Sequence, residues 1–222
     1  MKYNSKMKSK IHVLLAILFI LTTSVRAQTH KLMFETPFGS FKVVLYDYTP
    51  KHRDLILYAL KTDVYKEAFF NRVIEHFVVQ GGEHDIDIEK REAVDPTHQK
   101  PRLAPEFDDK AFHKTGALGA GRDNNPEKAS FLNQIYFVVG KPVTAADLDD
   151  LEKKKNIKYT QEQRKTYLQT GGQPRLDKDY TVFGEVYEGL DVLMRIGKVE
   201  TDEEDFPIQK IPFTIKELPH EK

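Results

Sequence analysis

The sequence predicts a single domain built mainly from β-strands, with few helices. Short runs with strand character, either alternating or rich in β-branched and aromatic residues, recur along the chain. These runs lie at residues 31–35, 40–47, 69–82, 135–139, 181–187 and 211–218. A chain of 222 residues with 40% hydrophobic residues has room for one core of ordinary size. Many strands with few helices indicate a β-barrel or a β-sandwich.

The first 27 residues have the pattern of a secretory signal peptide. Four lysines precede an apolar core at residues 11–21, and a polar stretch ends at Ala27, after which we expect cleavage. Because about 20 apolar residues are needed to span a bilayer, a permanent membrane anchor is the weaker interpretation, and no stable span is expected after cleavage. The chain has no cysteine, so it can carry neither a disulfide nor a lipidated cysteine. An exported protein of this kind suits a bacterial periplasm, and release outside the cell is the alternative.

The charge balance argues against partners selected by bulk electrostatics. The chain carries 34 basic and 34 acidic residues, and residues 1–27 hold five of the basic residues and none of the acidic ones. The mature chain is therefore mildly acidic. We expect no nucleic-acid partner and no attraction to an anionic membrane, because both depend on an excess of positive charge.

The N-terminal half predicts a hairpin followed by a helix. Residues 31–35 and 40–47 alternate apolar and polar side chains around a Pro-Phe-Gly turn. Thr49 followed by Pro50 then marks a helix start, because proline is favoured at the first helical position. Residues 83–106 are polar and contain three prolines, which predicts a long surface connection.

The C-terminal half predicts a helical hairpin inserted between strands. Residues 144–155 and 160–170 each begin with the pattern of a capping box, and two glycines follow the second segment. Residues 116–121 read GALGAG, which resembles a phosphate-binding loop only superficially, because no Lys-Ser or Lys-Thr follows at the required offset. A further helix is expected at residues 189–196.

Arg72 and Gln80 interrupt an otherwise apolar run, FFNRVIEHFVVQGG, that ends in two glycines. If two short strands flank a bend in this run, alternation places Arg72, Val78 and Gln80 on one face. Nearby aromatic surface would come from Phe70 and Phe77. A guanidinium beside an amide and an apolar floor suits a peptide carbonyl lying across a hydrophobic groove. The alternative is an exposed arginine on an edge strand, which is the commoner place for arginine.

Four segments occur in a characteristic order: FFNRVIEHFVVQGG, GALGAGRDNNPEKAS, NQIYFVV and RLDKDYTVFGEVYEGLDVL. Together they resemble the cyclophilin family of peptidyl-prolyl cis/trans isomerases, over about residues 32–218. The resemblance implies an eight-stranded, antiparallel, closed β-barrel capped by two helices, near residues 50–61 and 189–197. The cyclophilin-like domain would occupy residues 28–222, with the helical hairpin at about 144–171 as an insert.

The resemblance also implies roles for individual residues. Arg72 would be the catalytic arginine, and Gln80 the amide that orients it and contacts the peptide. The proline pocket and the adjoining peptide surface would be formed by Phe77, Val78, Gly121, Arg122, Gln134, Tyr136, Leu176 and Tyr180. Taken singly, several of these residues have a plainer interpretation: the apolar ones as ordinary core, and Gln134 as the partner of a backbone group.

Several residues depart from the family pattern. Val78 stands where methionine is usual, Tyr136 where a pocket phenylalanine is usual, and Tyr180 replaces a histidine. Asn71 stands where a histidine is common, and Arg175 where many relatives carry a tryptophan. Small residues are replaced by Phe131 and Leu132, which could crowd the rim of the pocket.

No metal site or cofactor is expected. Three of the histidines, His84, His98 and His113, lack helical ligand spacing and are expected to be solvated. The acidic cluster at residues 202–205 is most simply a solvated turn, because its spacing lacks the pattern of a calcium-binding EF-hand.

The predicted function is that of a periplasmic, monomeric prolyl isomerase that speeds the folding of exported proteins. Its partners would be proline-containing peptides and unfolded exported chains. Two alternatives remain open: a cyclophilin-like barrel that only binds peptides or envelope partners, and a general holdase. The insert is rich in charged residues, which favours a solubilising role over a partner-binding one.

Overall fold

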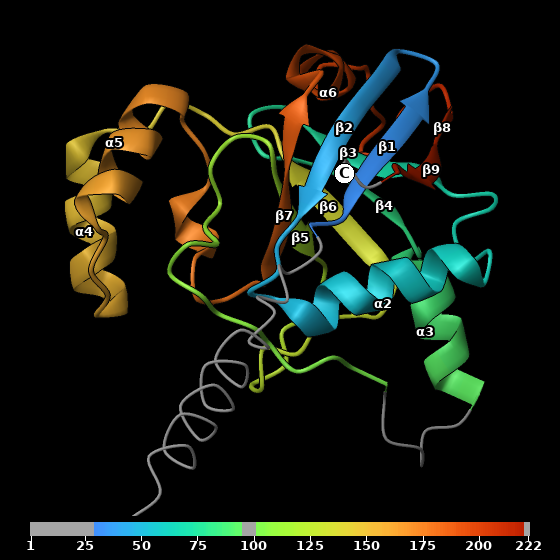
Figure 1. The fold of residues 1–222 in the computed structure, drawn as a ribbon, viewed down its shortest axis with the longest axis horizontal. Helices are drawn as coiled ribbons and strands as arrows, with labels where there is room; N and C mark the ends of the chain where they lie inside the picture. The colour runs from blue at the N-terminus through green and yellow to red at the C-terminus, as the bar shows by residue number, and fades with distance from the viewer. Residues whose placement is uncertain (1–28, 95–100, 220–222) are drawn as a thin grey trace, which may run out of the picture.

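A computed structural model describes residues 29–94 and 101–219, so the predicted signal peptide lies outside the described residues. The strands are β1 (Lys31–Thr36), β2 (Gly39–Leu45), β3 (Phe69–Ile74), β4 (Val78–Gly82), β5 (Ala117–Ala120), β6 (Gln134–Val138), β7 (Val182–Glu188), β8 (Ile211–Pro212) and β9 (Thr214–Glu217). They form one antiparallel sheet in the order β8-β3-β4-β6-β5-β7-β2-β1-β9, which curls into a nearly closed barrel (Figure 1). The predicted mainly-β barrel is therefore confirmed.

The difference between eight predicted strands and nine observed ones arises at the C-terminal segment. Residues 211–218, expected as one strand, are divided into β8 and β9 on either side of Phe213. β8 pairs with β3, whereas β9 pairs with β1. At the division the backbone N–H of Phe213 donates to the carbonyl of Ala68, at 3.1 Å. One continuous segment thus joins the two ends of the sheet.

The barrel interior is filled by aromatic side chains. Phe34 stacks on Phe41 with ring centroids 5.0 Å apart, and Phe137 meets both rings edge-on at 5.1 and 5.2 Å. Phe70 belongs to this core and is fully buried, which corrects the expectation that it adds aromatic surface near Arg72. The reason is an irregularity in the register between Phe70 and Arg72, which breaks the alternation that would otherwise put them on one face.

The helices α2 (Pro50–Lys61) and α6 (Leu190–Ile196) lie at opposite ends of the barrel, as predicted (Figure 1). α2 begins at Pro50, but Thr49 makes no side-chain cap. The carboxylate of Glu106 takes that role, because it accepts the backbone N–H groups of Lys51 and His52 at 3.0 and 2.9 Å. A residue from a distant loop therefore fixes the start of this helix.

Residues 83–106 contain a helix that the sequence analysis did not predict. α3 (Asp85–Val94) follows β4 directly and buries Ile88. Six of its ten residues are charged, so the composition indicated a loop, whereas the prolines all lie beyond the helix. None of the helices within residues 29–94 and 101–219 combines the length and the apolar character needed to cross a bilayer.

The predicted helical hairpin is present as α4 (Ala145–Lys155) and α5 (Gln161–Thr170), beside the barrel (Figure 1). Both predicted capping boxes form, at Thr144 and Thr160. The hairpin packs on the barrel through its own small core, which consists of Phe112, Val143, Leu148, Tyr159 and Tyr167. After it comes the short 3₁₀ helix η1 (Pro174–Leu176). The insert is thus joined to the domain by a buried apolar contact.

Candidate active site

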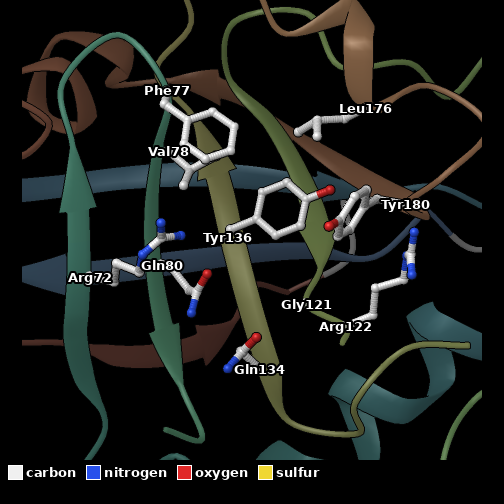
Figure 2. Close-up of a pocket in the computed structure, with 10 residues that line it drawn as sticks. All are labelled: Arg72, Phe77, Val78, Gln80, Gly121, Arg122, Gln134, Tyr136, Leu176 and Tyr180. Atoms are coloured by element: carbon white, nitrogen blue, oxygen red, sulfur yellow. The ribbon is translucent and has the colours of Figure 1, made fainter. Parts of the chain in front are cut away.

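A pocket of about 150 Å³ opens on the outer face of the barrel. It is formed where the strands turn one set of side chains inward and the other outward: Val79 and Phe137 enter the core, and their neighbours Gln80 and Tyr136 line the pocket. The lining residues are Arg72, Phe77, Val78, Gln80, Gly121, Arg122, Gln134, Tyr136, Leu176 and Tyr180 (Figure 2). The structure therefore brings together all ten residues that the sequence analysis named for the site.

The strand register sets these residues in rows across the sheet. Gln80 on β4 lies opposite Arg72 on β3 and opposite Tyr136 on β6, and Tyr136 in turn lies opposite Gly119 on β5. Directly opposed residues have Cβ atoms about 5 Å apart, so the side chains of this row are neighbours. A guanidinium, an amide and an aromatic ring thus stand in line across the pocket.

The GALGAG segment makes room for that row. A Cβ on Gly119 would overlap the ring of Tyr136, and a Cβ on Gly121 would overlap the side-chain amide of Gln134. The glycines therefore let two β6 side chains lie flat over β5. Their role is close packing against the pocket floor.

Arg72 reaches from β3 toward Gln80 and Val78 (Figure 2). Its side chain is 35% exposed, and its Nε atom lies 3.3 Å from Oδ2 of Asp205. Gln80, which is predicted to orient Arg72, lies opposite it on β4, and the ion pair of the guanidinium is made with Asp205. A permanently charged guanidinium, paired with a carboxylate, thus lies at the mouth of the pocket.

Asp205 is a site residue that sequence reasoning missed. It belongs to the acidic cluster at residues 202–205, adopts a left-handed φ of 68°, and accepts the backbone N–H of Val73 at 2.9 Å. Non-glycine residues rarely adopt such a φ without a local constraint. The turn is therefore anchored to β3 beside Arg72, which a sequence pattern typical of a solvated turn could not indicate.

Two arginine–aromatic pairs flank the pocket. The guanidinium carbon of Arg175 lies 4.4 Å from the ring centroid of Phe77, and that of Arg122 lies 4.5 Å from the centroid of Tyr180. Arg122 also donates from Nε to the carbonyl of Asp179 at 2.6 Å. At the position where the family resemblance places a tryptophan, Arg175 therefore covers one face of a pocket aromatic.

The pocket floor is formed by Tyr136, which is buried. Its hydroxyl lies 2.8 Å from Nε2 of His113, and its ring meets Tyr180 edge-on with centroids 6.1 Å apart. Burial raises the pKa of Tyr136 well above its ordinary value, so the hydroxyl keeps its proton.

His113 corrects a further expectation from the sequence. It was expected to be solvated, but its side chain is only 1% exposed and lies between Tyr136 and Asp177. His84 is partly buried and packs edge-on against Phe69 at 4.3 Å, and His98 lies outside the described residues. Within the described ranges, no group of three or more His, Cys, Asp or Glu side chains is placed to hold a metal ion.

The unusual residues before Gln134 do not crowd the pocket. Phe131 is buried and its ring lies 4.4 Å from the guanidinium carbon of Arg102, and neither Phe131 nor Leu132 is among the ten lining residues. Asn71 is also buried and is absent from the lining. The hollow beneath Arg72 is therefore open to a ligand.

Comparisons with known proteins agree with this architecture. The family model described as cyclophilin type peptidyl-prolyl cis-trans isomerase/CLD matches residues 31–217. A protein of Staphylococcus saprophyticus, assigned as a peptidyl-prolyl cis-trans isomerase, is 30% identical over 193 residues, which cover 86% of this chain and 92% of the relative. The peptidyl-prolyl cis-trans isomerase CYP18-2 of Arabidopsis thaliana is 23% identical over 82% of this chain and 88% of its own length.

Solved structures show the same fold. The crystal structure of a cyclophilin-type peptidyl-prolyl cis-trans isomerase from Cryptosporidium parvum matches with a TM-score of 0.59 and 16% identity, over 86% of this chain and 99% of the other. Its structure in the presence of the dipeptide Ala-Pro matches with a TM-score of 0.57, over 84% and 98%. The chain belongs to the cyclophilin-type peptidyl-prolyl cis-trans isomerase family, which confirms the resemblance seen in the sequence.

Proposed function

We propose that this isomerase acts at the ten-residue pocket, with Arg72 as the catalytic residue, and that its activity serves the folding of exported proteins. The observation that carries the proposal is the guanidinium of Arg72, paired with Asp205, at the mouth of an open pocket that combines apolar and polar side chains.

The reaction breaks no covalent bond. Rotation about a peptide bond faces a barrier of roughly 18–20 kcal/mol, because the nitrogen donates electron density into the carbonyl. X-Pro bonds therefore isomerise over tens to hundreds of seconds without a catalyst. In the transition state the amide is twisted and its nitrogen has regained a lone pair. A donor placed at that nitrogen binds the twisted form better than either planar form, and so lowers the barrier.

Arg72 meets this requirement through its position and its charge. Its N–H groups are donors that need no proton transfer, and Asp205 holds them in place before the peptide arrives. A donor that is fixed in advance costs no reorganisation during the reaction. Asp205 therefore supports Arg72 as a positioning residue.

The pocket beside Arg72 suits a proline ring. Apolar surface comes from Phe77, Val78, Leu176 and the ring of Tyr136. An apolar cavity of about 150 Å³ can hold benzene. A five-membered ring therefore fits in a pocket of about 150 Å³. The C. parvum relative was crystallised with Ala-Pro, which supports proline-containing peptides as the ligands of this pocket.

A peptide isomerisation assay tests the assignment of Arg72. We expect Arg72→Ala to lower kcat/KM by about 100-fold or more, the usual cost of removing one transition-state donor. Arg195→Ala is the matched control, because Arg195 lies on α6 in a surface ion pair with Asp191. Equal activity of the wild type and the Arg72→Ala variant would contradict the proposal and would leave the peptide-binding module as the better interpretation.

The proposed role in export rests on the predicted signal peptide. We infer a periplasmic location from residues 1–27, which carry basic residues, an apolar core and a small residue at the cleavage point. Mass spectrometry of the protein recovered from a fractionated bacterial host is expected to give Gln28 as the first residue. Recovery of the intact chain in the cytosolic fraction would contradict this location.

A further inference from the structure

A buried chain of polar groups runs from the pocket floor to the helical insert. The Tyr136 hydroxyl lies 2.8 Å from His113 Nε2, and His113 Nδ1 lies 2.7 Å from Asp177 Oδ1. The hydroxyl of Tyr167, on α5, donates to Asp177 Oδ2 at 2.5 Å. All four residues are at least nine-tenths buried. We refer to Tyr136, His113, Asp177 and Tyr167 as the floor relay.

The carboxylate of Asp177 determines which group donates and which accepts in each hydrogen bond of the floor relay. An ionised carboxylate can only accept hydrogen bonds, and Oδ1 of Asp177 also accepts the backbone N–H of His113 at 2.9 Å. In the neutral imidazole, Nδ1 is therefore the protonated nitrogen and Nε2 is the acceptor. The hydroxyl of Tyr136 donates to Nε2, so its only proton is directed away from the pocket.

The insert also contacts residues 174–179, the segment that carries the pocket residue Leu176, at several other points. The Nζ of Lys155, in the last turn of α4, donates to the carbonyls of Arg175 and Asp177 at 2.6 Å each and pairs with Asp179 at 2.6 Å. The hydroxyl of Tyr159 donates to the carbonyl of Pro174 at 3.0 Å. The backbone on both sides of Leu176 is thus bound to the insert.

We propose that His113 is a positioning residue for the pocket floor, held in one tautomer by Asp177 and, through Asp177, by Tyr167 of the insert. Its function is to accept the hydrogen bond of the Tyr136 hydroxyl. The pocket floor then presents only the apolar ring of Tyr136 to the proline. This inference rests on the proposed function of the pocket. It gives the insert a role in the isomerase site in place of the solubilising role expected from its charge.

The physical reason is the cost of an unpaired polar group. A buried hydroxyl without an acceptor either stays unsatisfied, which is costly, or recruits water. At the floor of the pocket, an unsatisfied hydroxyl or a bound water would each weaken the binding of the apolar proline ring. A phenylalanine at position 136 would need no relay, whereas a tyrosine does.

Kinetics on a proline peptide test the inference with a double-mutant cycle of His113→Asn and Tyr136→Phe. Asparagine keeps a side-chain N–H close to the position of Nδ1 and so retains the bond to Asp177, but it removes the acceptor for Tyr136. We expect His113→Asn to raise KM about three- to tenfold, equivalent to about one hydrogen bond, with kcat changed less than about twofold. In the Tyr136→Phe background the same substitution is expected to change KM by less than about twofold.

The matched control is His52→Asn, the same substitution in a buried histidine that does not line the pocket. His52 also faces a carboxylate through Nδ1 and a hydroxyl through Nε2, at 2.7 and 3.2 Å. We expect this variant to lose stability to a similar degree without any change in KM. Equal KM values for the His113→Asn and His52→Asn variants would overturn the inference, as would an equal rise in both Tyr136 backgrounds.

Nitrogen-15 NMR of His113 separates failure of the inference from failure of the proposed function, because it needs no substrate. We expect a protonated Nδ1 and an unprotonated Nε2 in the wild type. The reverse tautomer would overturn the inference even if the protein is active and the Arg72→Ala variant is not. If the wild type and the Arg72→Ala variant isomerise the peptide equally, the proposed function fails, and the relay then has no role in catalysis.

Discussion

Two buried histidines in this barrel sit in nearly identical surroundings but serve different parts of the molecule. His52 lies between Glu106 and Ser130, at 2.7 and 3.2 Å, and His113 lies between Asp177 and Tyr136, at 2.7 and 2.8 Å. Each is a carboxylate–histidine–hydroxyl chain. The difference is the place of the hydroxyl, which is in the wall of the barrel for one chain and at the floor of the pocket for the other.

The His52 chain is structural. It has the connectivity of a hydrolase triad, but Ser130 is only 1% exposed, and its backbone is paired with Leu103. Glu106 meanwhile caps α2 through two backbone N–H groups. The comparison teaches that the order of groups in such a chain does not define its function. Function depends on whether the last group reaches a surface that a ligand can touch.

Removing the carboxylate of each chain is expected to have the largest effect. Glu106→Ala removes the cap of α2 and leaves His52 Nδ1 without its partner, and Asp177→Ala leaves His113 and Tyr167 unpaired. We expect each to lower the free energy of unfolding by about 2–4 kcal/mol, measured by urea denaturation. Only Asp177→Ala is expected to raise KM, because only its chain ends in the pocket.

The two variants are therefore expected to lose similar stability but to differ in KM. Both are to be assayed at a temperature at which circular dichroism shows them folded. A rise in KM for Glu106→Ala equal to that for Asp177→Ala would show that the two chains act alike, and the distinction between wall and floor would be wrong.

The pH dependence of stability offers a smaller effect that is specific to the His52 chain. Burial lowers the pKa of His52 below its ordinary value of 6.5, against the opposing effect of Glu106. The unfolded chain therefore takes up a proton as the pH falls below about 6.5, whereas His52 in the folded chain takes it up only at a lower pH. Because the unfolded state then binds more protons, the free energy of unfolding should fall between pH 7 and pH 5.

Glu106 acts in the same direction at lower pH. Burial opposes its ionisation, but hydrogen bonds from His52 and from the start of α2 hold its pKa below the ordinary value of 4.5, so its contribution is lost in acid. Urea denaturation at several pH values checks the His52 effect by comparison with His52→Asn, in which the loss between pH 7 and pH 5 should be smaller. An identical pH dependence in the two proteins would refute the assignment.

Much of the fold follows from local patterns in the sequence. The strands alternate or are rich in β-branched residues, the capping boxes at Thr144 and Thr160 specify two helix starts, and Pro50 specifies a third. These signals are local, so they can be recognised without knowledge of the tertiary structure. The ten pocket residues could be named because they occur in four segments of a family pattern.

The features that sequence reasoning missed depend on contacts between distant parts of the chain. Asp205 pairs with Arg72 through a turn that looks solvated in sequence, and His113 is buried only because Asp177 and Tyr136 surround it. Phe70 enters the core because the register of β3 is irregular. None of these features leaves a periodic or compositional signal near the residue concerned.

The most direct test of the account is NMR exchange spectroscopy of a short Ala-Pro peptide with the wild type and the Arg72→Ala variant. The peptide is expected to bind both proteins, because the apolar pocket is intact in each, whereas accelerated exchange between its cis and trans forms is expected only with the wild type. Acceleration that persists in the Arg72→Ala variant at the wild-type rate would contradict the claim that Arg72 stabilises the twisted amide.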